Sequence, residues 1–191
     1  FGKVVPGVFQ DEAEVRPAGV DDNPVVNYTP AMFDRFRHRY GYDLRAHLPS
    51  LYENTGPADL RVRHDFYGLI LELLIEGWAK PYYDYCTSRN LHLTGHYWEH
   101  EWPRPVLNPD NMATGAYAHM PGIDVLMNDF RTDMHAQFGN VRAVKEIRSI
   151  ANQLGRERTL SETFGAGGWE MPFADQKRIA DWEYALGVNF M

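Results

Sequence analysis

The chain has 191 residues, of which 44% are apolar and 14% aromatic, with one cysteine and a formal net charge of −7. This length and apolar content are enough for one domain with a sizeable core. The acidic balance argues against nucleic acid as the main partner, no apolar run is long enough to cross a membrane, and one cysteine excludes an internal disulfide framework.

The N-terminal half predicts one strand followed by helices. Its apolar run is typical of a buried strand and stops at Asp11, while Pro30 suits the first position of a helix that Gly41 ends. Beyond it, apolar residues recur at the spacing of a helix packed along one face. The expected elements are a strand over residues 4–9, a loop to about 27, helices over 31–40 and 43–51, and a long helix over 59–86.

The C-terminal half predicts further strands that alternate with helices. Two helices are closed by Gly155 and Gly187, and the second of these should place Phe173, Ile179, Trp182 and Leu186 on its inner face. The expected elements are a strand over 91–95, a loop over 96–121, a strand or short helix over 123–127, a helix over 141–154, a strand over 158–161, a helix over 172–186, and the start of a strand at 188–191.

This alternation predicts a parallel sheet with helical cover. A closed eight-unit barrel needs about 250 residues, and only four or five units are visible here. We therefore expect an α/β fold in which residues 1–191 form a single catalytic-barrel domain of the TIM type or a fragment of one; the alternative is an open α/β sheet. The first residue is not methionine, so processing from a longer chain is also expected.

Carboxylates stand at the carboxyl ends of the expected strands. Asp11 and Glu12 follow the first strand, Glu99 the second and Glu162 the fourth, with Asp124 in the third. Such ends meet at one edge of a parallel sheet, so these side chains should converge on one opening. Two carboxylates are what glycosidic cleavage needs, one to protonate the leaving oxygen and one to attack or to activate water.

Structural interpretations of the same carboxylates remain open. Asp11 or Glu12 could cap a turn or pair with Arg16, and Asp124 could accept from backbone amides. Glu162 could begin a helix, although the glycines that follow oppose one. Two tryptophans close to the candidates in sequence, Trp98 and Trp169, favour a site, because burial beside such rings raises the pKa of an acid and aromatic faces stack on sugars.

A zinc site is the sharpest alternative. His96-Tyr97-Trp98-Glu99-His100 matches the inverted zinc-peptidase motif, with Glu99 as base and Glu162 as a possible third ligand. That motif requires a helix, whereas an expected strand precedes it and prolines follow it closely. A nucleophilic triad has less support, because no G-x-S-x-G motif occurs and Cys86 lies in a predicted core helix.

Several short motifs occur in a fixed order along the chain: Phe9-Gln10-Asp11-Glu12, Tyr40-Gly41-Tyr42-Asp43-Leu44 with Leu48-Pro49, Thr94-Gly95-His96 followed by Glu99, Met120-Pro121-Gly122-Ile123-Asp124, Leu160-Ser161-Glu162-Thr163-Phe164-Gly165, and Asp181-Trp182 with Gly187-Val188-Asn189. Together they resemble the catalytic barrel of glycoside hydrolase family 106, the α-L-rhamnosidase-type enzymes. The resemblance extends from Phe9 to Met191.

The resemblance implies an inverting hydrolysis that uses two glutamates, with calcium as the expected cofactor. Glu162 would be the base, and the acid would be Glu99 or Glu12, a choice that stays open. The glutamate that is not the acid would bind substrate or calcium, as could Asp11 and Asp124. The residues expected to bind the sugar are Asp11, His96, Trp98, Asp124 and Trp169.

The expected partner is therefore an oligosaccharide or polysaccharide substrate, such as a rhamnoside side chain, without nucleic acid or membrane. Family members are much longer than this chain, so other domains of a longer enzyme are expected around it, and a secreted or periplasmic location is favoured. A non-catalytic carbohydrate-binding barrel fragment and a zinc-dependent hydrolase are the alternatives.

Overall fold

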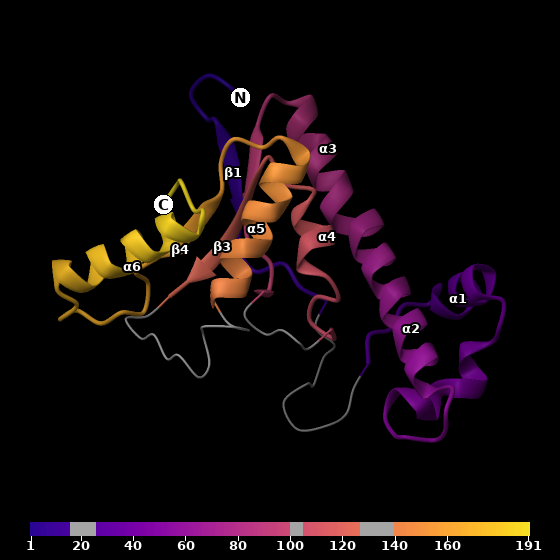
Figure 1. Ribbon diagram of the computed structural model, residues 1–191. Coiled ribbons are helices and arrows are strands. Elements are labelled where there is room, and N and C mark those ends of the chain that lie inside the picture. The colour runs from indigo at the N-terminus through magenta and orange to yellow at the C-terminus, as the bar shows by residue number, and fades with distance from the viewer. Residues whose placement is uncertain (16–25, 100–104, 127–139) are drawn as a thin grey trace.

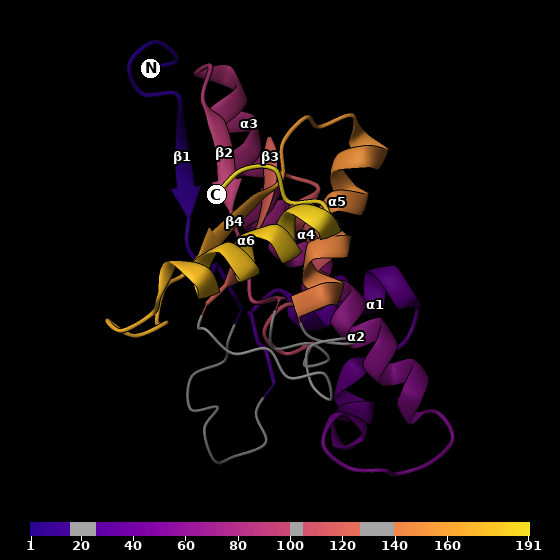
Figure 2. The same cartoon turned by 60° about the vertical axis from the view of Figure 1, so that its left-hand side comes forward.

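The computed structural model describes residues 1–15, 26–99, 105–126 and 140–191, which build an α/β fold around one parallel sheet. Its four strands stand in chain order: β1 (Gly7–Gln10), β2 (His92–Gly95), β3 (Met120–Val125) and β4 (Leu160–Thr163). They curl into half of a barrel with helices on its outer side (Figure 1, Figure 2). The predicted partial barrel is confirmed.

The strands differ from the predicted ones mainly at their bounds. β1 begins three residues later than expected and includes Gln10, and β3 begins earlier, at Met120, which decides for a strand over a helix there. Glu162 lies inside β4 rather than after it, paired in register with Asp124 of β3. Phe190 forms a parallel bridge with Leu160, so the strand expected at residues 188–191 does begin beside β4.

The connection from β1 to β2 is built from helices. It contains α1 (Met32–Tyr40), the 3₁₀ helix η1 (Leu44–Leu51), α2 (Asp59–Leu74), the π-helical turn η2 (Ile75–Ala79) and α3 (Lys80–Ser88). The one long helix predicted over 59–86 is thus interrupted by a π turn. In both views α1 and the start of α2 extend past the carboxyl ends of the strands, and α3 runs beside the sheet.

The extension has a core of its own. Phe36 of α1, Leu44 of η1 and Phe66 and Leu69 of α2 are completely buried against one another. Gly41 ends α1 in the left-handed conformation with φ 78°, as expected of a glycine at that position. This cluster is separate from the core of the sheet, so the extension beside the strand ends is held together by its own buried residues.

The remaining helices cover β2, β3 and β4. They are α4 (Asn111–Gly115), α5 (Asn140–Leu154) and α6 (Phe173–Leu186), and α4 was not predicted within the expected loop. Ile123, Val144 and Val188 make the core between β3 and α5. Phe173 is 87% exposed, so its expected place on the inner face of α6 was wrong: the helix begins beyond the sheet, and only its later turns contact the core.

None of the helices in the described ranges combines the length and the apolar character needed to span a bilayer.

Candidate active site

The loop after β1 brings two carboxylates to the opening of the half-barrel. Gln10 ends the strand with a buried side chain, and Asp11 and Glu12 follow directly. Glu12 has a φ of 46°, a left-handed backbone that is uncommon for a residue with a side chain. Such local strain is frequent where a side chain must be aimed at a functional site.

His96 follows β2 at the same edge of the sheet. Its side chain is only 1% exposed, its backbone N–H donates to the carbonyl of Gln10 at 3.1 Å, and its ring meets Phe9 edge-on at a centroid distance of 5.5 Å. The preceding Gly95 has a φ of 115°, and a Cβ there would overlap the backbone of Gln10. The glycine therefore allows the chain to turn tightly enough to bury His96 beside β1.

The His96 ring joins the ends of three strands. Its Nε2 lies 2.9 Å from Oε2 of Glu162 and 3.8 Å from Oδ1 of Asp11. Possible ligand atoms of Asp11, Glu12 and His96 all lie within 4.8 Å of one another. We call Asp11, Glu12, His96, Asp124 and Glu162 the carboxylate cluster.

Burial and like charge shift the pKa values in this cluster. Burial alone would lower the pKa of His96, but the hydrogen bond with Glu162 and the charges of Glu99 and Asp124 outweigh it and raise that pKa. Burial raises the pKa of Asp124 to about 6, an effect that His96 opposes and Glu162 reinforces. Burial also raises the pKa of Glu12. Asp124 and Glu12 therefore keep their protons to a higher pH than exposed carboxylates do.

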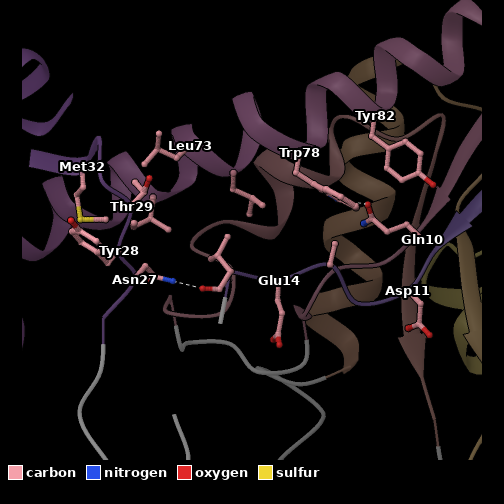
Figure 3. A pocket seen from close by; sticks show the side chains of 14 residues that line it. Gln10, Asp11, Glu14, Asn27, Tyr28, Thr29, Met32, Leu73, Trp78 and Tyr82 are labelled. Atoms are coloured by element: carbon pink, nitrogen blue, oxygen red, sulfur yellow. Dashed lines mark hydrogen bonds between the residues drawn. The ribbon is translucent and has the colours of Figure 1, made fainter. Parts of the chain in front are cut away.

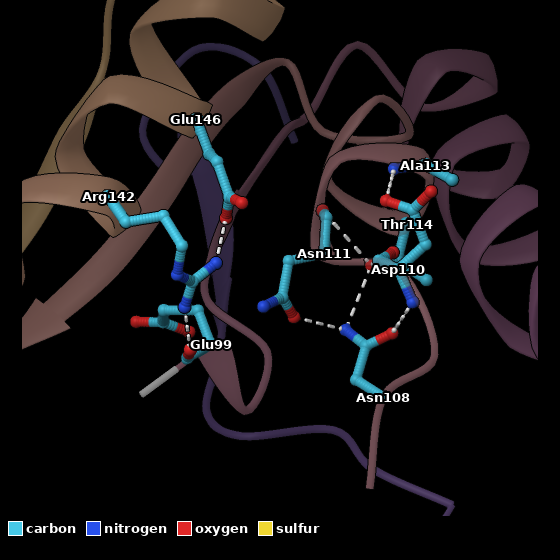
Figure 4. Close-up of polar contacts among 8 residues, drawn as sticks. All are labelled: Glu99, Asn108, Asp110, Asn111, Ala113, Thr114, Arg142 and Glu146. Atoms are coloured by element: carbon cyan, nitrogen blue, oxygen red, sulfur yellow. Dashed lines mark hydrogen bonds and ion pairs between the residues drawn. The ribbon is translucent and has the colours of Figure 1, made fainter. Parts of the chain in front are cut away.

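Glu99 lies beneath the opening rather than in it. Its side chain is 3% exposed, and Oε1 accepts the backbone N–H of Asp124 at 2.6 Å. Burial raises the pKa of Glu99 to about 7. Figure 4 shows Arg142, which donates to the backbone carbonyl of Glu99 and pairs with Glu146 of the same helix. Glu99 thus fixes the end of β3 from the helical side.

A cavity of about 810 Å³ lies beside the cluster, between the loop after β1 and the junction of α2, η2 and α3 (Figure 3). Asp11 belongs both to its lining and to the cluster. We call it the Trp78 cavity. The residues that line it include Asp11, Glu14, Asn27, Tyr28, Trp78 and Tyr82.

The two predicted tryptophans differ in their exposure. Trp169 is fully exposed in the turn after β4, and Trp98, two residues after His96, is partly buried. His100 and Arg16 fall outside the described residues. Residues 96–98 are not helical, although the zinc-peptidase motif requires a helix that presents both histidines on one face.

Sequence reasoning missed two groups near the site. Trp78 lies within the helix predicted over residues 59–86, yet it is 45% exposed and its indole N–H donates to Oε1 of Gln10 at 2.7 Å. Glu183 of α6 is completely buried behind β4, where it accepts from the hydroxyl of Thr163. A carboxylate among the apolar positions of a helix was the available signal for Glu183.

Comparison with known proteins agrees with the geometry. The family model for α-L-rhamnosidases of glycoside hydrolase family 106 matches residues 20–191. A solved rhamnosidase from Novosphingobium sp. PP1Y shares 24% sequence identity with the chain and superposes with a TM-score of 0.64. That match covers 87% of this chain and 16% of the rhamnosidase, so the chain spans a small part of that protein's length. A comparison with curated proteins finds no match.

Proposed function

The chain belongs to glycoside hydrolase family 106, the α-L-rhamnosidases, and on that premise we propose that its carboxylate cluster hydrolyses an α-L-rhamnosidic bond. The observation that carries the proposal is the contact of 2.9 Å between Nε2 of His96 and Oε2 of Glu162, with Asp11 beside them at the carboxyl ends of the strands. The substrate would be an oligosaccharide or polysaccharide that ends in rhamnose.

Glu162 is the proposed general base. Its side chain is 44% exposed, so a water molecule can reach it, and the hydrogen bond with His96 holds one of its oxygens. A carboxylate that is both accessible and oriented can accept a proton from the water that attacks the anomeric carbon. His96 positions this base. Its ring is buried too deeply for its face to stack on a sugar.

Glu12 is the proposed general acid. It lies in the cluster and is only partly buried, whereas Glu99 is almost fully enclosed and its Oε1 accepts from a backbone amide. The direction of the pKa shift at Glu12 is consistent with this role, because an acid must hold its proton until the leaving oxygen takes it. Glu99 would then act as a positioning residue for Asp124.

A calcium ion is the proposed cofactor. Calcium prefers oxygen ligands, and the cluster offers the exposed carboxylate of Asp11 and the buried Oδ1 of Asp124, which has no hydrogen-bond partner. His96 is a poorer ligand for this ion because calcium seldom binds nitrogen. Bound there, the ion would supply positive charge that orients sugar hydroxyls, while Glu12 stays available as the acid.

Hydrolysis of a panel of 4-nitrophenyl glycosides by the full chain tests the proposal. The wild type should release nitrophenol from the α-L-rhamnoside in the presence of calcium. Glu162→Gln should lower kcat by about 10²–10⁴-fold, the usual contribution of a general base. The matched control is Glu170→Gln, because Glu170 is an exposed glutamate in the turn after the same strand. Turnover of other sugars only, or full activity in Glu162→Gln, would contradict the proposal.

A further inference from the structure

The Trp78 cavity has one wall of aromatic rings. Trp78 and Tyr82 stand on successive turns of the η2–α3 segment, with ring centroids 5.5 Å apart and planes at 70°. The hydrogen bond from the indole N–H to Gln10 fixes the orientation of Trp78, yet almost half of the side chain stays exposed. Tyr28, from the opposite side, is also largely exposed. An ordered but uncovered tryptophan suits contact with a ligand.

The spacing of one helical segment places the rings in this cavity. Ile70, Leu74, Trp78 and Tyr82 follow one another at intervals of four residues, and all of them line the cavity. The π turn at Ile75–Ala79 lies within this segment. Single π turns within helices occur frequently at functional sites.

The wall opposite the rings carries polar groups, and hydrogen bonds hold its backbone in place. The side-chain amide of Asn27 donates to the carbonyls of Val15 and Val106, and the N–H of Val15 donates to Leu107 at 3.1 Å. These contacts join Val15 and Asn27 to the segment that contains Val106 and Leu107. Glu14 and Thr29 complete this polar side of the lining, as Figure 3 shows.

Asp11 connects the cavity to the carboxylate cluster. Its carboxylate lies 3.8 Å from the His96 ring and also lines the cavity, so the two spaces share a boundary. A ligand whose first ring occupies the cluster would extend directly toward Trp78. The volume of about 810 Å³ lies within the range of sites that enclose small molecules.

From this arrangement we propose that the Trp78 cavity binds a second sugar ring, the one next to the terminal sugar held at the carboxylate cluster. The aromatic wall would contact the apolar C–H face of that ring, and the amide, hydroxyl and carboxylate groups opposite would bind its hydroxyls. A polar wall of this kind favours a hydroxyl-rich ring over a flat aromatic leaving group. The inference rests on the proposed function and assigns the part of the substrate beyond the scissile bond.

Calorimetric titration of the full chain with two probes tests the inference. The probes are methyl α-L-rhamnoside and a disaccharide in which rhamnose is α-linked to a second rhamnose, and both are titrated into Glu162→Gln so that the bond stays intact. The disaccharide should bind roughly tenfold more tightly, and Trp78→Ala should remove that advantage without changing the affinity for the monosaccharide.

Two further variants guard against a trivial loss of folding. Tyr28→Ala removes an exposed ring from the rim and should weaken only the disaccharide. Phe173→Ala is the matched control, because Phe173 is also a largely exposed ring, at the start of α6 and outside the lining. Thermal unfolding shows whether each variant keeps the fold.

The outcomes separate this inference from the proposed function. Three results would overturn the second-ring site. The two probes could bind with equal affinity, or neither could bind. The disaccharide could also bind Trp78→Ala and Tyr28→Ala as tightly as it binds the parent. A different result would separate the two proposals. If the disaccharide binds in a way that depends on Trp78 but the wild type hydrolyses no rhamnoside, the second-ring site is supported and the proposed hydrolysis is rejected. An effect of Trp78→Ala confined to 4-nitrophenyl rhamnoside would assign the cavity to an aromatic leaving group instead and so overturn the inference.

Discussion

Nε2 of His96 and Oε2 of Glu162 lie 2.9 Å apart, although β3 separates the strands from which they come. Neighbouring strands are spaced by about 4.8 Å, so second neighbours in a flat sheet stand almost 10 Å apart. The contact is possible because the sheet curls and both side chains reach across the end of β3. The curvature of the half-barrel is therefore what brings Glu162 and His96 together.

Replacing His96 with asparagine should lower kcat for 4-nitrophenyl rhamnoside by roughly 10–100-fold, with a smaller change in KM, because Glu162 loses the group that orients it. Steady-state kinetics measures both constants, and thermal unfolding checks the fold. His38→Asn changes an exposed histidine on α1 and should leave kcat unaltered. A larger effect on KM than on kcat would identify His96 as a sugar ligand instead.

The two candidate acids can be separated by the leaving group. Glu12→Gln should lose about 10²–10³-fold with a poor leaving group, such as a methyl rhamnoside, and much less with 2,4-dinitrophenyl rhamnoside, which departs without a proton. Glu99→Gln should show the same modest loss with both substrates, because it acts through Asp124. The reverse pattern would assign the acid to Glu99.

Glu183 should make the stability of the fold depend on pH. Burial raises its pKa from 4.5 to about 7, so the folded protein holds this proton more tightly than the unfolded chain. Between these two pH values stability falls as the pH rises, by about 1–3 kcal/mol in all. Glu183→Gln should therefore unfold at a higher temperature than the wild type at pH 8, and the difference should vanish near pH 4. Equal unfolding temperatures of Glu183→Gln and the wild type at pH 8 would show that other groups offset the cost of burying the Glu183 carboxylate.

Gly95→Ala should destabilise the protein by more than about 3 kcal/mol, because the added methyl group would overlap the backbone of Gln10 at a φ that alanine avoids. Gly56→Ala is the matched control, since a Cβ at Gly56 meets nothing within 4 Å. Urea unfolding followed by circular dichroism gives both values. A loss below about 1 kcal/mol would mean that the β1–β2 contact can relax.

Calcium should stabilise the wild type through Asp11. Adding calcium to chelator-treated protein should raise the unfolding temperature by a few degrees, as expected for a ligand that binds only the folded state. Asp11→Asn should reduce that rise, while Asp34→Asn, which changes an exposed carboxylate on α1, should leave it intact. The same rise in Asp11→Asn would place the ion elsewhere.

The fold was predictable where local rules act alone. Gly41, Gly155 and Gly187 marked helix ends correctly, and the predicted strands located β2 and β4 to within two residues. Pro30 lies two residues before the first residue of α1 rather than at its first position. The short α4 was missed because its five residues carry no amphipathic pattern; the carboxylate of Asp110, which accepts the N–H of Ala113, is the main local support for it.

The convergence of the strand-end residues was predictable, but the burial of each side chain was not. Residues at strand ends converge by topology, so Asp11, His96 and Glu162 could be named together from the sequence. That Glu99 turns to the helical side depends on the path of the chain after Gly95, which no sequence pattern encodes. The exposure of Trp78 was equally hidden from the sequence, because a tryptophan four residues after Leu74 fits a buried helix face, whereas in the structure both residues border a cavity.

The π turn at Ile75–Ala79 also gives this segment a place where its length can vary. A wider turn of this kind accommodates one more residue than the α-helix it interrupts. Deleting one residue from Ile75–Ala79 should therefore restore a continuous helix, while Tyr82 and the buried Cys86 keep their neighbours. A single-residue deletion, which would rotate the remainder of an ordinary α-helix by about 100°, should here be absorbed locally.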